Sequence, residues 1–262
     1  MGSKWVHNSK FNFEFSDFLA IFVVMQIQAA LYLIPVEIAD NSQEWSIPTA
    51  NIHIVKEIRT FIVENVRTAR RALRRWDREF PIDACTFHEL NGHTPESEIP
   101  AMLDALRQGE PIGVMSEAGC PAVADPGAQV VAIAQREALK VVPLVGPSSI
   151  LMSLMASGLN GQGFAFNGYL PVRDDERAKV VKELENRALR HHQTQIFIET
   201  PYRNNRLVSF LAQTLRPDTL LCVACDITDP EKEQILTLPA AKWRNKALNF
   251  DKRPAIFLIG PH

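Results

Sequence analysis

The feature that most constrains the fold of this 262-residue chain is a repeated alternation of short apolar segments and helical segments in its first half. Each apolar segment has the length of a single strand, and each following stretch carries apolar residues at helical spacing. Because this alternation is typical of parallel strands with helices packed on their faces, it predicts α/β units around a buried sheet. The strand and helix pairs are 60–65 with 67–78, 111–117 with 126–138, and 140–146 with 147–158.

The second half of the chain is richer in strands. We therefore expect two α/β domains, 29–145 and 146–262, joined near residues 144–148. Neither an internal repeat nor a low-complexity linker is visible. The elements expected after residue 158 are strands at 164–171, 194–200, 219–228, 233–239 and 254–260, with helices at about 173–190 and 201–215.

Residues 1–28 are expected to be an irregular leader outside the core, followed by a core strand at 29–36. The run 18–35 is nearly all apolar, so a signal peptide or a membrane-spanning helix is an alternative. Gln26 and Gln28 interrupt this run, which favours the leader and argues against membrane insertion. Met25 lies just before the strand, and we expect it to be the natural start, with residues 1–24 dispensable.

The composition is that of an ordinary globular protein, with 46% apolar and 22% charged residues. The formal net charge of −2 gives no overall positive field that would attract nucleic acid, although it permits a local basic patch. Four cysteines are too few for a disulfide scaffold in a chain of this length. A reducing, cytoplasmic setting is therefore expected.

The segment SEAGCPAVADPG (116–127) joins a predicted strand to a predicted helix and carries strong backbone signals. Asp125 is expected to be the N-cap of that helix, with Pro126 at its first position and Gly127 behind it. This half of the segment is interpreted as a helix start.

The other half of the same segment is expected to bind a ligand. Ser116, Glu117 and Gly119 follow directly on the predicted strand, and open parallel sheets bind ligands at the carboxyl ends of their strands. Glycine also lets a ligand approach the backbone closely. A second junction with Gly-Pro and two serines follows at 143–149, so two small-residue turns are expected to face one cleft.

Six segments occur in a fixed order along the chain: LYLIPVEIAD (31–40), FIVENVR (61–67), SEAGCPAVADPG (116–127), PLVGPSS (143–149), FNGYLP (166–171) and FIETPYR (197–203). In their order and separation they resemble the motifs of the tetrapyrrole methylase superfamily. Within it they are most similar to the branch of ribosomal small-subunit methyltransferase I, which methylates a cytidine ribose 2′-hydroxyl in 16S rRNA. The resemblance covers about residues 29–260, and the order of six motifs is far more specific than any single one.

The resemblance implies a two-domain class III methyltransferase fold, with S-adenosylmethionine (SAM) in the interdomain cleft, and a homodimer. SAM carries an activated methyl group, so no metal is expected. Met155 is expected in the core or cleft lining, in contact with adenine. The positions that match the family's SAM contacts are Met115, Ser116, Glu117 and Cys120 in the first turn, Ser148 and Ser149 in the second, and Glu199, Ile227 and Ala255 on the second domain's side.

The sequence departs from the branch in segments that border the acceptor side. Ile-Ala-Asp stands at 38–40 where the branch usually has Ile-Gly-Asn, and Glu-Asn-Val-Arg stands at 64–67 where it has Glu-Asp-Thr-Arg. Glu117 replaces a common Asp. The leading expectation is 2′-O-methylation of ribose in 16S rRNA or the small ribosomal subunit. Methylation of a tetrapyrrole or another small molecule, and SAM binding without catalysis, are the alternatives.

Two carboxylates are candidates for catalysis. Because a ribose hydroxyl is a very weak acid, a carboxylate that accepts its proton would assist methyl transfer. Glu64 and Glu199 each end an apolar strand and are the predicted catalytic residues. The alternative is a structural carboxylate that caps a helix or pairs with Arg67 or Arg203.

A stripe of arginines on the helix at 67–78 bears on the acceptor. Their three- and four-residue spacing places them along one face, where Arg67, Arg70 and Arg74 are expected to contact RNA phosphates. The alternatives are a solvated face balanced by neighbouring acids or a dimer surface. The stripe consists of Arg67, Arg70, Arg71, Arg74, Arg75 and Arg78, with Ala69, Leu73 and Trp76 on other faces and Asp77 and Glu79 as the neighbouring acids.

No metal site is expected from the cysteine and histidine pattern. Cys222 and Cys225 match C-x-x-C but lie in a predicted strand, whose alternation sends their side chains to opposite faces. His88 and His93 are expected in a surface loop.

Overall fold

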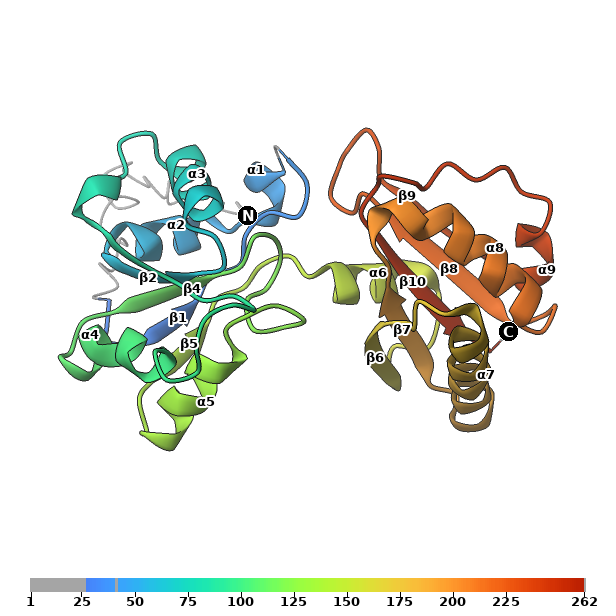
Figure 1. Ribbon diagram of the computed structural model, residues 1–262. Coiled ribbons are helices and arrows are strands. Elements are labelled where there is room, and N and C mark those ends of the chain that lie inside the picture. Colours follow the sequence, from blue (N-terminus) through green and yellow to red (C-terminus); the bar gives the residue numbers. More distant parts are fainter. Residues whose placement is uncertain (1–26, 41, 262) are drawn as a thin grey trace, which may run out of the picture.

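The computed structural model describes residues 27–40 and 42–261. These residues form two five-stranded sheets. Figure 1 shows the two sheets as separate bodies, the first built from the N-terminal half and the second from the C-terminal half, with α6 between them. The α/β fold class predicted from the sequence is confirmed.

The first sheet is entirely parallel, with the strand order β3-β2-β4-β1-β5. All residues of the central strands β2 and β4 are buried, as expected for parallel strands covered on both faces. The strands are β1 (Leu31–Leu33), β2 (Thr60–Val63), β3 (Thr86–Glu89), β4 (Ile112–Met115) and β5 (Val141–Pro143).

Helices cover both faces of the first sheet. On one face Phe61 and Val63 pack against α2 and α3, whereas on the other Ile62 and Ile112 pack against α5 and a 3₁₀ helix. This division follows from the alternation of side chains along a strand. The elements are α1 (Gln43–Ser46), α2 (Thr49–Lys56), α3 (Val66–Trp76), α4 (Asp104–Arg107) and α5 (Ala128–Arg136), with 3₁₀ helices η1 (Ile82–Ala84) and η2 (Ile99–Leu103).

The second sheet is mixed, with the order β6-β7-β10-β8-β9, and only its β6–β7 pair is parallel. One face carries α7, α8 and α9, and the other carries α6. The strands are β6 (Phe164–Tyr169), β7 (Thr194–Ile198), β8 (Leu220–Cys225), β9 (Gln234–Pro239) and β10 (Ala255–Gly260); the helices are α6 (Ser149–Ser157), α7 (Asp174–His191), η3 (Pro201–Arg203), α8 (Asn204–Thr214) and α9 (Ala240–Trp243).

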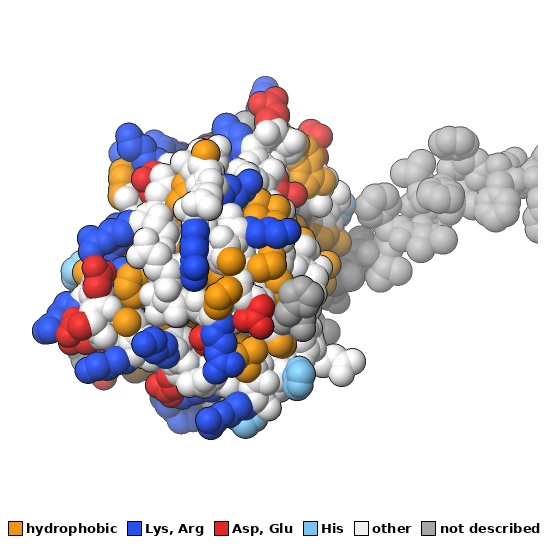
Figure 2. All heavy atoms as spheres, turned by 90° about the vertical axis from the view of Figure 1, so that its right-hand side faces the viewer, with side chains coloured by type: hydrophobic (Ala, Val, Ile, Leu, Met, Phe, Trp, Pro, Cys, Tyr) orange, Lys and Arg blue, Asp and Glu red, His pale blue; other side chains and the backbone are white. Residues whose placement is uncertain are grey.

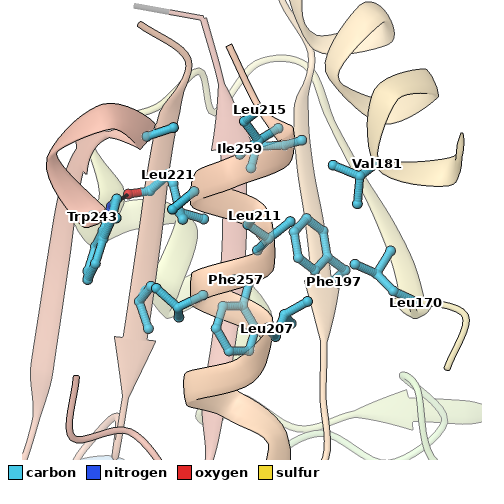
Figure 3. Close-up of a cluster of buried hydrophobic side chains, with 14 of the residues drawn as sticks. Leu170, Val181, Phe197, Leu207, Leu211, Leu215, Leu221, Trp243, Phe257 and Ile259 are labelled. Atoms are coloured by element: carbon cyan, nitrogen blue, oxygen red, sulfur yellow. Dashed lines mark hydrogen bonds between the residues drawn. The ribbon is translucent and has the colours of Figure 1, made fainter. Parts of the chain in front are cut away.

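The larger core of the second half lies between α8 and the sheet. Figure 3 shows Leu207 and Leu211 of α8 directed at Phe197 and Phe257 of the sheet. Trp243 closes one end of this core, and its indole N–H donates to the carbonyl of Leu221 at 3.0 Å. Because a buried indole N–H needs an acceptor, this bond fixes α9 to β8.

Most elements lie within a few residues of their predicted positions, but the start of α5 was predicted wrongly. Gly127, with φ of 124°, is the N-cap, and the helix begins at Ala128. Asp125 therefore does not cap the helix. The predicted strand 29–36 is shorter, because only Leu31–Leu33 pairs as a strand.

Two other expectations concern side chains on strands. His88 lies in strand β3, not in a loop, whereas His93 is in the turn that follows. Cys222 and Cys225 do face opposite sides of β8, since they belong to the hydrophobic clusters on the two faces of the second sheet. The short helices α1, α2, α4 and α9 were not predicted.

The boundary at residues 145 and 146 remains our proposal for the two domains. Its support is that α6 packs only against the second sheet's side, through Ile150 and Leu154. Within 27–40 and 42–261, no helix has the length and apolar character needed to cross a bilayer. The expectations for residues 1–24 and Met25 lie outside the described residues.

Candidate cofactor and substrate site

A cavity of about 210 Å³ lies where the two halves of the chain meet. Its first wall is the 118–125 segment after β4, and its second is the start of α6. The third wall is apolar and comes from the second sheet, through Phe166, Ile198 and Ile256. The two turns expected to face one cleft therefore do so.

Backbone and thiol contacts hold these turns together at the carboxyl ends of β1, β4 and β5. Val36 and Gly119 exchange two backbone hydrogen bonds, each 2.9 Å long. The thiol of Cys120 donates to the carbonyl of Pro147 at 3.3 Å. Gly146 packs so closely on the first loop that a Cβ placed there would lie 2.3 Å from Cβ of Pro35.

Four of the residues predicted to bind SAM belong to the turn after β4. Met115 and Ser116 are buried, Glu117 is exposed, and Cys120 lines the cavity. Burial raises the pKa of the Cys120 thiol, and the charge of Asp125 raises it further.

Ser148 and Ser149 line the same cavity from α6. Ser148 is also the N-cap of α6, where its hydroxyl accepts the Leu151 N–H at 3.4 Å. The sequence pattern had located these hydroxyls correctly because a Gly-Pro turn followed by serine is a helix start.

Six predicted cofactor residues are not among the lining residues of the cavity: Met115, Ser116 and Glu117 in the turn after β4, and Met155, Ile227 and Ala255 in the second half of the chain. Ile227 is buried in the cluster behind it, and Ala255 begins β10 next to the lining residue Ile256. Met155 is 82% exposed on α6 and is not among the lining residues. The structure thus does not bring Met155 to the place where we expected it to touch adenine.

A second cavity, of about 440 Å³, lies on the other side of the 145–150 segment and is lined by Trp45, Val145 and Met152. Thr228 borders it, and the hydroxyl of Thr228 accepts the Ala39 N–H at 3.2 Å. The loop 38–40, which departs from the branch pattern, therefore contacts the second half at this point.

Carboxylates gather beside the first cavity. Glu64, just after β2, accepts the backbone N–H of Glu117 at 3.2 Å. Asp125 lines the cavity, and its burial, together with the charges of Glu64 and Glu117, raises its pKa to about 6. A hydrogen bond from Ser116 opposes this rise. The sequence analysis did not predict that Asp125 lines the cavity, because Asp-Pro-Gly is a common helix start.

Glu199 directly follows Ile198, which lines the cavity, and its carboxylate is engaged in an ion pair. Its Oε1 accepts from Nη2 of Arg203 at 2.6 Å and from the Thr200 N–H at 2.7 Å, and only 7% of the residue is exposed. The structure thus gives Glu199 the partner that the structural alternative required. Its catalytic role stays a prediction.

The arginine stripe covers the exposed face of α3, while Ala69, Leu73 and Trp76 are buried. Arg78 lies beyond the end of the helix at Trp76. A shallow hollow of about 520 Å³ runs along this face and is lined by Val66, Arg67, Arg70, Arg71 and Arg74.

The acidic partners of the stripe are unevenly distributed. Arg70 pairs with Asp83 at 3.2 Å, and Arg75 pairs with Glu37. Asp77 pairs with Lys56 at 3.1 Å and also interacts electrostatically with Arg74. Among the described residues, the ion pairs include no acidic partner for Arg67 or Arg71.

The C-terminal half presents a different surface. Figure 2 views the molecule from that side and shows Lys and Arg side chains spread over the face among hydrophobic ones. On α3, by contrast, the arginines are closely spaced along one face of a single helix. Within the described residues, no group of three or more His, Cys, Asp or Glu side chains is arranged to hold a metal ion.

Comparison with known proteins finds ribosomal RNA methyltransferases among the relatives of the chain. The chain is 30% identical over 232 residues to ribosomal RNA small subunit methyltransferase I of Vibrio cholerae, an alignment that covers 87% of this chain and 76% of that protein. It is 30% identical over 205 residues to the Bacillus subtilis protein of the same name, covering 78% of this chain and 66% of that protein. No protein-family model matches the chain.

A solved structure agrees with the fold. The crystal structure of the methyltransferase CobJ superposes with a TM-score of 0.59, covering 88% of this chain and 94% of that one. At 14% sequence identity this likeness speaks for the fold alone. The identity to the Vibrio cholerae protein over most of both chains shows that the chain belongs to the ribosomal RNA small subunit methyltransferase I family.

Proposed function

We propose that this protein transfers a methyl group from SAM to a ribose 2′-hydroxyl of 16S rRNA in the small ribosomal subunit. The observation that carries the proposal is the cavity shared by the turn after β4, the start of α6 and the second sheet. Membership of the rRNA methyltransferase family supports the acceptor.

The residues around the cavity fit SAM chemically. Adenosine needs an apolar slot, which Phe166, Ile198 and Ile256 provide. Gly119 has φ of 72°, a conformation that favours glycine, and it lines the cavity without a side chain that would fill it. Cys120 and Ser149 offer polar groups for the amino-acid end. When bound, SAM supplies the activated methyl group.

The carboxylates near the cavity suit the charge of this cofactor. A sulfonium is a cation, and it is favoured next to the negative charges of Glu64, Glu117 and Asp125. In-line transfer otherwise requires an acceptor that is held in place with water excluded. The half-buried position of Asp125 is compatible with such exclusion.

The basic face of α3 supports RNA as the acceptor. This helix begins two residues after Glu64, so Arg67 lies near the carboxyl end of β2, and Arg70 and Arg74 follow it along the same exposed face. Guanidinium groups bind phosphates and displace counterions, which makes such binding weaken with salt. We assign these arginines to the phosphates that flank the methylated nucleotide.

Methylation of a tetrapyrrole is the alternative that the departing loop 38–40 favours. The test is incubation of the pure protein with labelled SAM and either small ribosomal subunits or a porphyrinogen. Label in the RNA is expected, and its position is read by nuclease digestion. Label in the porphyrin would overturn the proposal, and label in neither would favour a SAM-binding protein without catalysis.

We further propose that the protein is a homodimer of the cytoplasm. Leu151 and Met155 lie one turn apart on α6 and are both exposed, and Val145 before this helix is 77% exposed. Exposed apolar side chains that gather in this way are typical of subunit contacts. The four cysteines are free thiols, as a reducing compartment requires.

A further inference from the structure

We propose that Asp125 is the catalytic carboxylate that accepts the proton of the ribose hydroxyl during methyl transfer. The inference rests on the function proposed above and assigns one step of it to a residue that the sequence had placed in a helix cap. Three features of the structure carry it: the position of Asp125 in the cavity, the engagement of the other carboxylates, and the groups that face it.

The carboxylate of Asp125 is available because α5 does not use it. The helix is capped by Gly127, and it has no side-chain cap. Asp125 instead lines the cavity between the turn after β4 and the start of α6. A base must lie within hydrogen-bond reach of the proton that it removes, and Asp125 is the carboxylate among the lining residues of this cavity.

The neighbouring carboxylates are less suited to this step. Both Arg203 and the Thr200 N–H already engage the carboxylate of Glu199, so it is not free to accept the ribose proton. Glu64 already accepts the Glu117 N–H. Glu117 itself is exposed and is not among the lining residues.

The groups facing Asp125 strengthen it as a base. Burial is the main reason that the pKa of Asp125 rises to about 6, and the like charges of Glu64 at the end of β2 and Glu117 after β4 add to this rise. The Ser116 hydroxyl, which also donates to the Ala118 carbonyl, has one proton to share and opposes the rise only in part. The other nearby titratable group of the turn, the Cys120 thiol, has a raised pKa and is uncharged at neutral pH.

The opposite walls of the cavity bring no cation to Asp125. They consist of Ser148 and Ser149 from α6, Tyr169 from β6 and apolar residues of the second sheet. A carboxylate with a pKa of about 6 is ionised at neutral pH and binds a proton more tightly than an ordinary Asp. This is the combination that a general base needs.

The step balances without another reactant. The ribose oxygen forms a bond to the methyl carbon while the bond from that carbon to the sulfonium sulfur breaks, and its electron pair stays on sulfur. The hydroxyl proton passes to the Asp125 carboxylate. The products are a methyl ether, S-adenosylhomocysteine and a neutral carboxylic acid, which then releases its proton to water.

The test compares the wild type with Asp125→Asn in single-turnover methylation of small ribosomal subunits, from pH 5 to pH 8. The wild-type rate is expected to rise with pH and then to level off, with an inflection below 6, because the sulfonium of bound SAM lowers the pKa of Asp125 from its value of about 6 in the free protein. The variant should lose this inflection, and its rate should fall by roughly 100-fold or more. Calorimetric titration should show that the variant still binds SAM, with an affinity weakened by no more than about tenfold, because one of the three negative charges near the sulfonium is lost.

Two further variants test whether Asp125 acts as the general base or only lies near the reacting groups. Glu64→Gln removes a charge that raises the pKa of Asp125, so the inflection should move to lower pH and remain visible. Asp218→Asn, at an exposed site before β8, is the matched control and should behave like the wild type.

The outcomes against the inference are distinct. An inflection that persists in Asp125→Asn, or that disappears in Glu64→Gln, would remove Asp125 from the role. Loss of SAM binding in Asp125→Asn would make it a cofactor ligand instead. A wild type that labels no RNA would defeat the proposed function and this inference together, whereas an active wild type with an equally active variant would defeat the inference alone.

Discussion

The buried carboxylate of Glu37 accepts a hydrogen bond from Nε of Arg75 at 2.6 Å. It also accepts the indole N–H of Trp76 at 3.1 Å. These bonds join the loop after β1 to the end of α3, so the helix that carries the arginine stripe is fixed to the loop that borders the second cavity. The Glu37 side chain is 3% exposed, whereas that of Arg75 is 42% exposed.

Removal of Glu37 should destabilise the protein more than removal of Arg75. Glu37→Ala leaves the indole N–H of Trp76 buried without an acceptor, and a cost of about 2–4 kcal/mol in the free energy of unfolding is expected. Arg75→Ala leaves the buried charge of Glu37 without its ion-pair partner, although the Trp76 hydrogen bond remains. Because the arginine is half-exposed, solvent screens its ion pair, and a smaller cost of about 1–2 kcal/mol in the free energy of unfolding is expected. Urea unfolding measures both costs. Equal costs would contradict the prediction that the buried Glu37 contributes more to stability than the half-exposed Arg75.

Gly146→Ala should disturb the junction between the two cavities. The added Cβ would lie 2.3 Å from Cβ of Pro35, which real atoms do not tolerate, so the backbone must shift. A loss of about 1–3 kcal/mol in stability is expected, together with weaker SAM binding by calorimetry. Gly161→Ala is the matched control, because nothing lies within 4 Å of its Cβ, and it should change neither quantity. Unchanged SAM affinity in Gly146→Ala would separate this junction from the cofactor site.

The arginines of α3 should differ in their effect on RNA binding. Arg67 and Arg74 are exposed, and their substitution by Gln should reduce the slope of log affinity against log salt by roughly one each. Arg75→Gln is the comparison within the same helix, since Arg75 already pairs with Glu37 and should change the slope less. Filter binding of 16S rRNA fragments at several salt concentrations measures the slopes. An affinity that does not depend on salt would exclude the stripe as a phosphate site.

The exposed apolar residues of α6 should support the proposed dimer. Leu151→Glu and Met155→Glu each place a charge on this face and should shift the protein toward the monomer in sedimentation equilibrium. Val172→Glu is the control, because Val172 is also 63% exposed but precedes α7 on another part of the surface. A dimer that survives both α6 substitutions would place the interface elsewhere.

The raised pKa of Asp125 has a consequence for stability. The folded pKa of about 6 exceeds the ordinary 3.8, so the native state binds this proton more tightly than the unfolded chain. The contribution of Asp125 to the free energy of unfolding is therefore lost as pH rises from about 4 to about 6. The full shift corresponds to about 3 kcal/mol, and solvent screening of this half-exposed group reduces it to about 1 kcal/mol.

Asp125→Asn should accordingly be more stable than the wild type at pH 7.5, by about 1 kcal/mol, and nearly equal to it at pH 4. Urea unfolding at the two pH values gives the difference directly. A variant that is less stable at pH 7.5 would show that Asp125 makes a stabilising contact that outweighs its desolvation.

Much of the fold follows from local sequence signals. The apolar segments that became β2, β4 and β10 were recognised because each is short, continuous and followed by turn residues. The element β3 was missed because Thr86–Glu89 is only partly buried at a sheet edge, so its residues lack a continuous apolar pattern. The short helices α1 and α4 carry too few turns for a periodicity to be visible.

The residues of the candidate site were likewise predicted from the sequence only in part. Cys120 and Ser149 were located from the sequence because each belongs to a turn directly after a predicted strand, and parallel strands bring such turns to one edge. Met155 was misplaced because helical spacing does not tell which face of α6 the sheet covers.

The sequence by itself therefore determined the order of the elements, the two turns that face the cavity and the family to which the chain is similar. Only the tertiary structure decided the roles of the carboxylates. In it, Glu199 forms an ion pair with Arg203, Glu37 accepts a hydrogen bond from Arg75 of α3, and Asp125 lines the cavity. The physical reason is that the pKa and partners of a carboxylate depend on burial and on charges brought near by distant parts of the chain, which no local pattern encodes.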